Sequence, residues 1–266
     1  MDRFAAQVLD AVRAVGDTVV LPAFEARPEI ERKGDGSLVT AADRAAEAAL
    51  ARALRAIVDA PVFGEETISE DPSLLWRLAV ADRAWIVDPI DGTKQFATGD
   101  TRFSILVAWA IHGEPIASWI VHPALGLHAV ATPAGCYVDG CPAGPPAGVG
   151  PTLANFTHFP PRVPRDRGTE HDLNSGWALR RLLVGEASAH LTSHVTPWDS
   201  TAGIVAWRAA GGTVERTDRR PWRLADTEAA LLYAADPQAW EILHRDLLDG
   251  YDGPVGPSFR PPGFLA

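Results

Sequence analysis

Hydrophobic residues at helical spacing open the chain. They predict an amphipathic helix that ends before Pro22. The residues that carry this pattern are Phe4, Val8, Val12, Val15 and Val19. The segment 31–40, ERKGDGSLVT, predicts a glycine-containing loop or hairpin. The alanine-rich segment 40–57 predicts a second helix, with Thr40 as its N-cap and Asp43 at the matching capping-box position.

Strand-like runs follow this helix. The segments 60–67, APVFGEET, and 85–93, WIVDPIDGT, are apolar runs that each end in acidic residues. A meander of strands is predicted over 103–111, 114–123 and 126–140. These runs indicate that a β-sheet occupies most of the first half of the chain.

The clearest break in composition is the proline- and glycine-rich segment 141–151, CPAGPPAGVGP. Beyond it the pattern predicts a strand, a helix followed by a strand, a helix that stops at Gly211-Gly212, two further strands and a last helix. We therefore expect an α/β protein in two parts, an α+β part over residues 1–140 and an α/β part over residues 141–266.

Composition and charge narrow the class of protein. The hydrophobic fraction of 47% and the charged fraction of 22% are those of an ordinary soluble globular protein. A net charge of -10 argues against a nucleic-acid partner, because nucleic-acid binding usually needs a basic face. An acidic chain suits divalent cations instead, provided that the carboxylates converge in one cleft.

Cysteine content and hydropathy predict the compartment. Cys136 and Cys141 are the only cysteines, too few for a disulfide scaffold and a weak zinc signal, so we expect two reduced thiols in a cytoplasmic protein. The N-terminal segment is charged and has no cleavage-type signal. No apolar run approaches the ~18 residues that a membrane span requires, so no membrane association is expected.

Acidic residues gather at the ends of predicted elements. Glu65 and Glu66 follow one strand, Asp88 and Asp91 lie at the end of another, and Asp199 opens a helix. Neighbouring carboxylates repel one another and raise each other's pKa, so such clustering is costly without a counter-charge. Hard divalent cations such as Mg²⁺ remove that cost. The pattern therefore favours a cation site.

Within DPIDGT, Pro89 fixes the backbone so that the side chains of Asp88 and Asp91 and the Ile90 carbonyl can converge. Gly92 permits a sharp turn, and the amides that follow suit a phosphate anion. Each feature has a simpler interpretation when taken alone: an Asp-Gly turn at 91–92, a solvated pair at 65–66, and an N-cap at Asp199.

Taken together and in order, these segments resemble the inositol monophosphatase family of lithium-sensitive, Mg²⁺-dependent phosphatases. The matching residues are Asp43, GEE at 64–66, DPIDGT at 88–93, WD at 198–199 and GG at 211–212. The resemblance extends from the first helix to about residue 215. It implies a layered αβαβα sandwich of the inositol monophosphatase and fructose-1,6-bisphosphatase type, and commonly a homodimer.

The resemblance also implies roles for individual residues. Glu65, Asp88 and the Ile90 carbonyl would hold one Mg²⁺. Asp88, Asp91 and Asp199 would hold a second, and Glu65 would help to place a weaker third through water. Most of these ligands lie in the part of the chain before residue 141.

Other residues are implied to act on water and phosphate. Thr93, hydrogen-bonded to Asp43, would orient the attacking water. The backbone amides of Gly92 and Thr93 would meet the phosphate oxygens, and Glu66 would support the ligands beside it.

Substrate-selecting residues depart from the family pattern. Inositol-type members carry a glutamate where this chain has Thr192, and a small residue where it has Trp177, next to Ala178. We expect these three residues to line the substrate pocket, although Trp177 has a second interpretation as a core aromatic. The role of Lys33, in the loop before Thr40, is left open.

The substrate itself is open, because the substrate-selecting half is where the chain departs. Lys94 is more typical of the branch that hydrolyses 3′-phosphoadenosine 5′-phosphate, or it is only an exposed helix residue. His190 and His194 leave a histidinol-phosphate phosphatase as another alternative. A different class of protein, a non-catalytic relative that binds metal or phosphate for regulation, would not need both Asp43 and Thr93.

Overall fold

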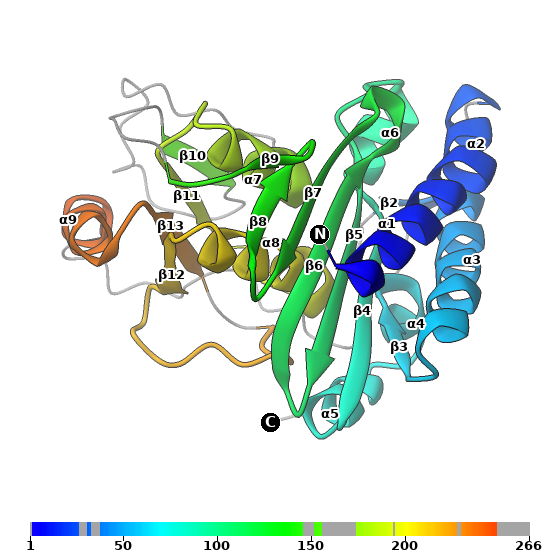
Figure 1. Cartoon of the computed structure of the whole chain (residues 1–266), viewed down its shortest axis with the longest axis horizontal. Coiled ribbons are helices and arrows are strands. Elements are labelled where there is room, and N and C mark those ends of the chain that lie inside the picture. Colours follow the sequence, from blue (N-terminus) through cyan, green and yellow to red (C-terminus); the bar gives the residue numbers. More distant parts are fainter. Residues whose placement is uncertain are drawn as a thin grey trace.

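The computed structural model is a stack of helical and sheet layers (Figure 1). It describes residues 2–26, 31–32, 38–145, 152–155, 174–193, 195–227 and 230–248. Lys33 and His194 lie outside the described residues. Within the described part of the chain, no helix has both the length and the apolar character that crossing a membrane demands.

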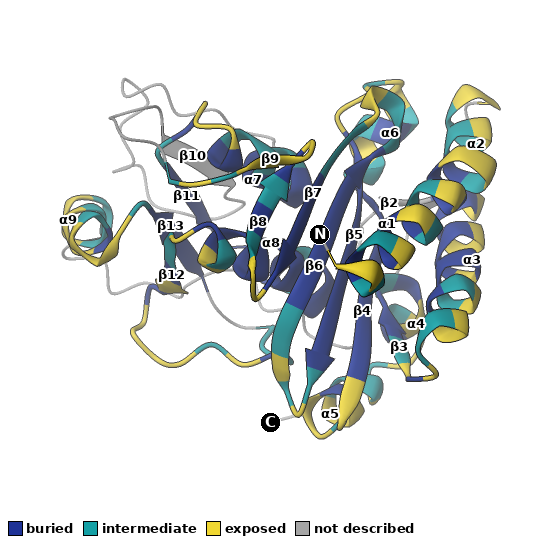
Figure 2. Cartoon of the chain, viewed as in Figure 1, coloured by how far each residue is buried: buried dark blue, intermediate teal, exposed yellow. Residues whose placement is uncertain are grey.

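The larger of the two main sheets has seven strands. Its strands, which lie side by side in chain order, are β3 (Val62–Gly64), β4 (Arg83–Asp91), β5 (Ser104–Ile111), β6 (Glu114–His122), β7 (Leu127–Thr132), β8 (Gly135–Val138) and β9 (Cys141–Pro142). The β3–β4 pair is parallel and all the others are antiparallel. The predicted meander is confirmed. All residues of β4 except Arg83 are buried, because helices cover both faces of this sheet (Figure 2).

Three helical segments cover one face of this sheet. They are α1 (Arg3–Val15), α2 (Leu21–Ala26) and α3 (Ala41–Ile57). Their apolar faces bury Val8, Val12 and Leu50 against Trp85 and Trp119. The hairpin predicted between α2 and α3 is confirmed by pairing of β1 (Glu31–Arg32) with β2 (Leu38–Val39).

The opposite face carries α7 (Ser175–Leu183) and α8 (Pro197–Ala209). Nearly every residue of α8 is buried, as expected of a helix enclosed on all sides. It packs between the large sheet, where it meets Leu106 and Ile120, and a second sheet, where it meets Leu231 and Tyr233.

The second sheet has four strands in the order β10-β11-β13-β12. These are β10 (Thr152–Asn155), β11 (Ala189–Thr192), β12 (Thr213–Arg216) and β13 (Leu231–Ala234). The last helix, α9 (Pro237–Leu248), covers its outer face through Trp240 (Figure 1). Helices, sheet, helices, sheet and helix follow in that order, so the predicted αβαβα sandwich is confirmed. The division near residue 140 stays a prediction.

The first helix, α1, ends at Val15, before Pro22 as expected, but further helical turns follow it directly. The helical path continues from α1 through a π-helical turn, Gly16–Val20, into α2. Pro22 is the second residue of α2, where a missing backbone N–H is tolerated. The hydrogen bonds of the π-helical turn join residues five apart, as from the Leu21 amide to the Gly16 carbonyl, and the turn connects α1 to α2.

Three short helices lie around the large sheet. They are α4 (Glu65–Glu70), α5 (Leu74–Ala79) and α6 (Thr93–Thr98). The run at 60–67 is therefore not a strand to its end, since Glu65 and Glu66 form the first turn of α4. Both α4 and α6 begin directly after a strand of the large sheet, which places their first turns at the same end of that sheet.

Candidate active site

Three aspartates converge where β4 ends. Asp88 and Asp91 lie on β4, and Asp199 lies in the first turn of α8. One carboxylate oxygen from each lies within 4.8 Å of the others. Asp88 is 1% exposed and Asp91 is 4% exposed, so the cluster is set into the protein.

An irregularity in β4 brings its two aspartates together. In a regular strand, residues three apart point to opposite faces of the sheet. The register of β4 against β5 shifts between Asp88 and Asp91, where Pro89 has no N–H to donate. The Ile90 amide donates to Asp88 Oδ1 at 3.0 Å and fixes the bend.

Burial and like charge dominate the electrostatics of the cluster. Burial, followed by the nearby Glu65, Asp91 and Asp199, raises the pKa of Asp88 well above its usual value. Burial and Asp199 raise the pKa of Asp91 to about 7. Among the residues that the structure describes, the charged groups with the largest effect on the pKa of Asp88 are all acids. Closely spaced carboxylate oxygens with this need for positive charge fit a hard divalent cation.

Asp91 is held by three hydrogen bonds. The Ser104 hydroxyl and the Gly176 amide each donate to Oδ2 at 2.7 Å, and the Ser175 amide donates to Oδ1 at 3.1 Å. A Cβ on Gly176 would overlap the Ser104 hydroxyl oxygen, so a glycine is needed there. These contacts tie the first turn of α7 to the large sheet.

Asp43 and Thr93 lie together beside the cluster. The Thr40 amide and hydroxyl donate to Asp43 Oδ2 at 2.7 and 2.6 Å, which confirms the capping box. The other oxygen, Oδ1, lies 3.4 Å from the Thr93 hydroxyl. Thr93 Oγ1 also lies 3.3 Å from the Ile90 carbonyl. The hydroxyl is therefore oriented by two acceptors.

Asp199 is held in the same way on another helix. Thr196 is the N-cap of α8, and its hydroxyl donates to Asp199 Oδ2 at 2.6 Å. The alternative in which Asp199 is itself the N-cap is wrong, since Asp199 lies three residues further on. Its side chain therefore reaches the cluster.

The Gly-Glu-Glu segment approaches the cluster from β3. Glu65 is half-buried, and its negative charge raises the pKa of Asp88. Glu66 is buried, with 6% of its surface exposed. Gly92 turns the chain between β4 and α6 with φ of 90°, a left-handed conformation that favours glycine. Thr93 is the first residue of α6, so its amide lies at that helix start.

The three residues expected to line the substrate pocket are buried or half-buried. Trp177 is half-buried and meets His122 edge to face, with ring centroids 5.7 Å apart. Thr192 is 4% exposed at the end of β11. Ala178 lies fully in the core, and its amide donates to the Asn174 carbonyl at 3.1 Å. The expectation that Ala178 lines a pocket therefore disagrees with its position, because its methyl group is enclosed by apolar neighbours.

The two residues tied to alternative substrates lie in different settings. Lys94 is exposed on α6. His190 is buried on β11 beside Tyr233, at 5.5 Å between ring centroids.

Four residues at the site were not anticipated. Glu47 and Thr196 had a detectable signal: Glu47 follows Asp43 by one helical turn, and Thr196 precedes Asp199 with the spacing of Thr40 and Asp43. The other two, Ser104 and Asn174, are recognisable only from tertiary contacts. Ser104 donates to Asp91, and Asn174, the N-cap of α7, donates to the Arg102 carbonyl.

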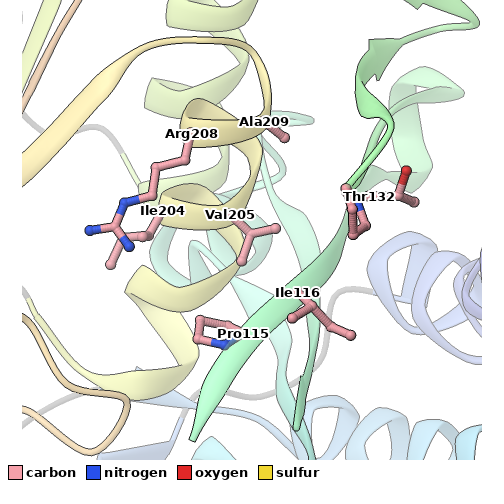
Figure 3. Close-up of a pocket in the computed structure, with 8 residues that line it drawn as sticks. Pro115, Ile116, Thr132, Ile204, Val205, Arg208 and Ala209 are labelled. Atoms are coloured by element: carbon pink, nitrogen blue, oxygen red, sulfur yellow. The ribbon is translucent and has the colours of Figure 1, made fainter.

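A well-formed pocket lies apart from these carboxylates. It has a volume of about 250 Å³ and lies between β6, β7 and α8 (Figure 3). The residues that line it are Pro115, Ile116, Thr132, Pro133, Ile204, Val205, Arg208 and Ala209. This lining is largely apolar and includes none of the acidic residues of the site. The aspartate cluster, with its convergent polar groups, is the better candidate for chemistry.

Comparison with known proteins agrees with this geometry. The sequence matches the model of the inositol monophosphatase family over residues 1–248. It is 30% identical over 245 residues to the 3′(2′),5′-bisphosphate nucleotidase CysQ of Escherichia coli strain K12, covering 85% of this chain and 95% of that protein. It is also 30% identical over 260 residues to the inositol-1-monophosphatase ImpA of Mycolicibacterium smegmatis, covering 86% of each.

A solved structure shares the fold. The IMPase/NADP phosphatase complexed with NADP and Ca²⁺ has a TM-score of 0.79 at 17% identity, covering 96% of this chain and 100% of that one.

The raised pKa values predict how pH changes the stability of the metal-free protein. A carboxyl with a raised pKa stabilises the fold below its unfolded pKa, near 3.8, and loses that contribution as the pH rises toward about 7. We expect the melting temperature in EDTA to fall between pH ~5 and ~8. Mg²⁺ should restore it by at least about 3 °C more at the higher pH, as measured by thermal unfolding.

Asp91→Asn removes one titrating group, so this variant should show a flatter pH dependence and a smaller response to Mg²⁺. The matched control is Asp59→Asn, an exposed aspartate away from the cluster, which should behave as the unsubstituted protein. An equal Mg²⁺ response at both pH values would contradict the link between cluster protonation and cation binding.

Proposed function

This chain belongs to the inositol monophosphatase family and is a phosphoric monoester hydrolase, and on that premise we propose how its residues perform the reaction. The substrate is a small phosphate monoester. The ligands of the proposed cation sites are Glu65, Asp88, the Ile90 carbonyl, Asp91 and Asp199, with two or three Mg²⁺ per site. The convergence of Asp88, Asp91 and Asp199 carries this proposal, because their oxygens lie within 4.8 Å.

The chemistry divides between cation and protein. When bound, the cations supply positive charge to the phosphoryl oxygens and lower the pKa of a bound water. The protein supplies positioning, which is most of what phosphoryl transfer requires. Asp91 is fixed by Ser104 and the first turn of α7, so its remaining lone pairs have a set direction.

Thr93 and Asp43 orient the attacking water. A hydroxyl has one proton, and in Thr93 it is directed toward Asp43 Oδ1, at 3.4 Å, or toward the Ile90 carbonyl, at 3.3 Å. The free lone pair of Thr93 Oγ1 then accepts a hydrogen bond from water. The water proton moves toward Thr93 Oγ1 as the hydroxyl proton moves toward Asp43. We assign Glu66 a supporting role for the neighbouring cation ligand, Glu65.

The phosphate meets backbone groups at the start of α6. The amides of Gly92 and Thr93 are the donors that we assign to its oxygens, since the first amides of a helix have no partner within that helix. The left-handed turn at Gly92 connects the end of β4, which carries Asp88 and Asp91, to the start of α6. Trp177 and Thr192 remain the proposed contacts of the rest of the substrate.

Sequence similarity does not identify the part of the substrate that carries the phosphate. CysQ and ImpA are named for different substrates, and both are 30% identical to this chain. An inositol phosphate is our first proposal, supported by the family model and by the similarity to ImpA, and it requires Thr192 and Trp177 to replace the contacts of the inositol-type residues. A 3′-phosphorylated nucleotide is a second, supported by Lys94, which is exposed two residues after the turn at Gly92.

Three further proposals follow from the family. We propose a homodimer, a cytoplasmic location and inhibition by lithium. An acidic chain with two free cysteines agrees with the proposed location.

Removing the Thr93 hydroxyl should slow hydrolysis while the fold is retained. Thr93→Ala and Asp91→Asn should each lower kcat by about 100-fold or more, within the usual effect of proton transfer and charge stabilisation. Steady-state phosphate release at saturating Mg²⁺ measures this. The control is Thr98→Ala, an exposed threonine at the other end of α6, which should keep its activity. Near-normal turnover in Thr93→Ala with an unchanged melting temperature would contradict the assigned role.

A substrate screen should separate the candidates. Inositol 1-phosphate, 3′-phosphoadenosine 5′-phosphate, histidinol phosphate and sugar phosphates are compared with Mg²⁺ by phosphate release. We expect inositol 1-phosphate to give the highest kcat/KM. If the nucleotide is preferred and Lys94→Ala abolishes that preference, the second proposal replaces the first. Absence of turnover on every ester would contradict the catalytic assignment.

A further inference from the structure

Glu47 is a buried acid for which the proposed reaction has no use. It lies on α3 and is 6% exposed. Its carboxylate accepts hydrogen bonds from the Glu66 amide at 2.8 Å, the Thr67 amide at 3.0 Å and the Thr67 hydroxyl. All three donors belong to the first turn of α4. Glu47 therefore binds the start of a helix to which it does not belong.

This contact replaces a missing helix cap. The first amides of a helix lack partners within it, and Gly64, the N-cap residue of α4, has no side chain to offer. A carboxylate near a helix N-terminus is also favoured by the helix dipole. Three donors offset the cost of burying the Glu47 charge.

Gly64 makes room for this arrangement. A Cβ at that position would overlap the carboxylate of Glu47. The Glu47 side chain thus packs against Gly64 and binds the amide of Glu66, the two residues on either side of Glu65. The backbone position of Glu65 is fixed from both sides.

Glu65 lies at the same end of the large sheet as Asp88, because β3 pairs in parallel with β4 and Gly64 lies opposite Val87. Glu47 follows Asp43 by one helical turn, so the two carboxylates lie on the same side of α3. Asp43 meets Thr93 of α6, and Glu47 meets the first turn of α4. One rigid helix therefore contacts both segments.

We propose that Glu47 is a positioning residue for the cation site, which holds Glu65 in place against Asp88, Asp91 and Asp199. This inference rests on the ligand role given to Glu65 in the proposed function. It makes α3 the element that sets the spacing between the cation ligands and the Thr93 hydroxyl.

The test measures Mg²⁺ binding directly. Glu47→Gln keeps the size of the side chain but places an amide group against backbone donors. Titration calorimetry with Mg²⁺ alone should show affinity reduced about 10-fold or more, the usual effect of changing a residue that orients a metal ligand. The Mg²⁺ concentration for half-maximal phosphate release should rise by the same factor. At saturating Mg²⁺, kcat should return to within about threefold of the unsubstituted protein, since the ligands themselves are intact.

The matched control is Glu70→Gln, at the exposed end of the same short helix, which should leave Mg²⁺ affinity unchanged. A double substitution separates positioning from general stability. In a Glu65→Gln background, Glu47→Gln should cause no further loss of Mg²⁺ affinity, because the ligand that it positions is already removed.

Two outcomes would overturn the positioning role by itself, and a third would overturn it together with the proposed function. One is a lower melting temperature in Glu47→Gln with unchanged Mg²⁺ affinity, while Glu65→Gln weakens binding; this leaves the proposed function intact. The other is an equal loss of affinity with and without Glu65→Gln. If Glu65→Gln itself leaves Mg²⁺ affinity unchanged, the ligand set of the proposed function fails, and the positioning role fails with it.

Discussion

Repulsion between buried carboxylates is the constraint around which this site is built. Asp88 and Asp91 are almost fully buried, and this burial, together with the like charge of neighbouring acids, raises the pKa of both. Hydrogen bonds from hydroxyls and amides hold the acids in place: Thr40 holds Asp43, and Ser104 holds Asp91. Such donors orient a carboxylate without neutralising it. The negative charge is therefore preserved for a cation, whereas an arginine or lysine in the same position would have consumed it.

Two helices from different layers begin with the same N-terminal capping arrangement. In α3 and in α8 a threonine N-cap is followed three residues later by an aspartate, and the threonine hydroxyl donates to that aspartate. The first turn of a helix favours negative charge, which offsets part of the cost of placing Asp43 and Asp199 there. The large sheet lies between these helices, and the bent end of β4 brings Asp88 and Asp91 to the place where both helices start. The site thus forms where three separate elements end or begin.

Local chemistry predicted much of this arrangement. The strand that ends in Asp88 and Asp91, the meander after it and the cap of α3 follow from short-range patterns. The features that the sequence did not predict share a physical cause. The start of α4 is capped by Glu47 from a distant helix, so no local signal marked Glu65 as helical. The hydrogen bond from Ser104 to Asp91 and the burial of Ala178 depend on how α7 packs, which sequence spacing does not encode.

Helix α7 connects Asp91 to Trp177, the residue that we propose as a contact of the substrate beyond its phosphate. Its Gly176 amide donates to Asp91, and the next residue, Trp177, packs on His122. Burial lowers the pKa of His122 to about 4, so the imidazole that packs edge to face with the indole is neutral. Because Gly176 and Trp177 are adjacent, the position of the indole and the direction of the Asp91 carboxylate are set by one helical turn. A Cβ at position 176 would overlap the Ser104 hydroxyl oxygen, so Asp91 can keep its hydrogen bonds beside the large side chain of Trp177 only if residue 176 is a glycine.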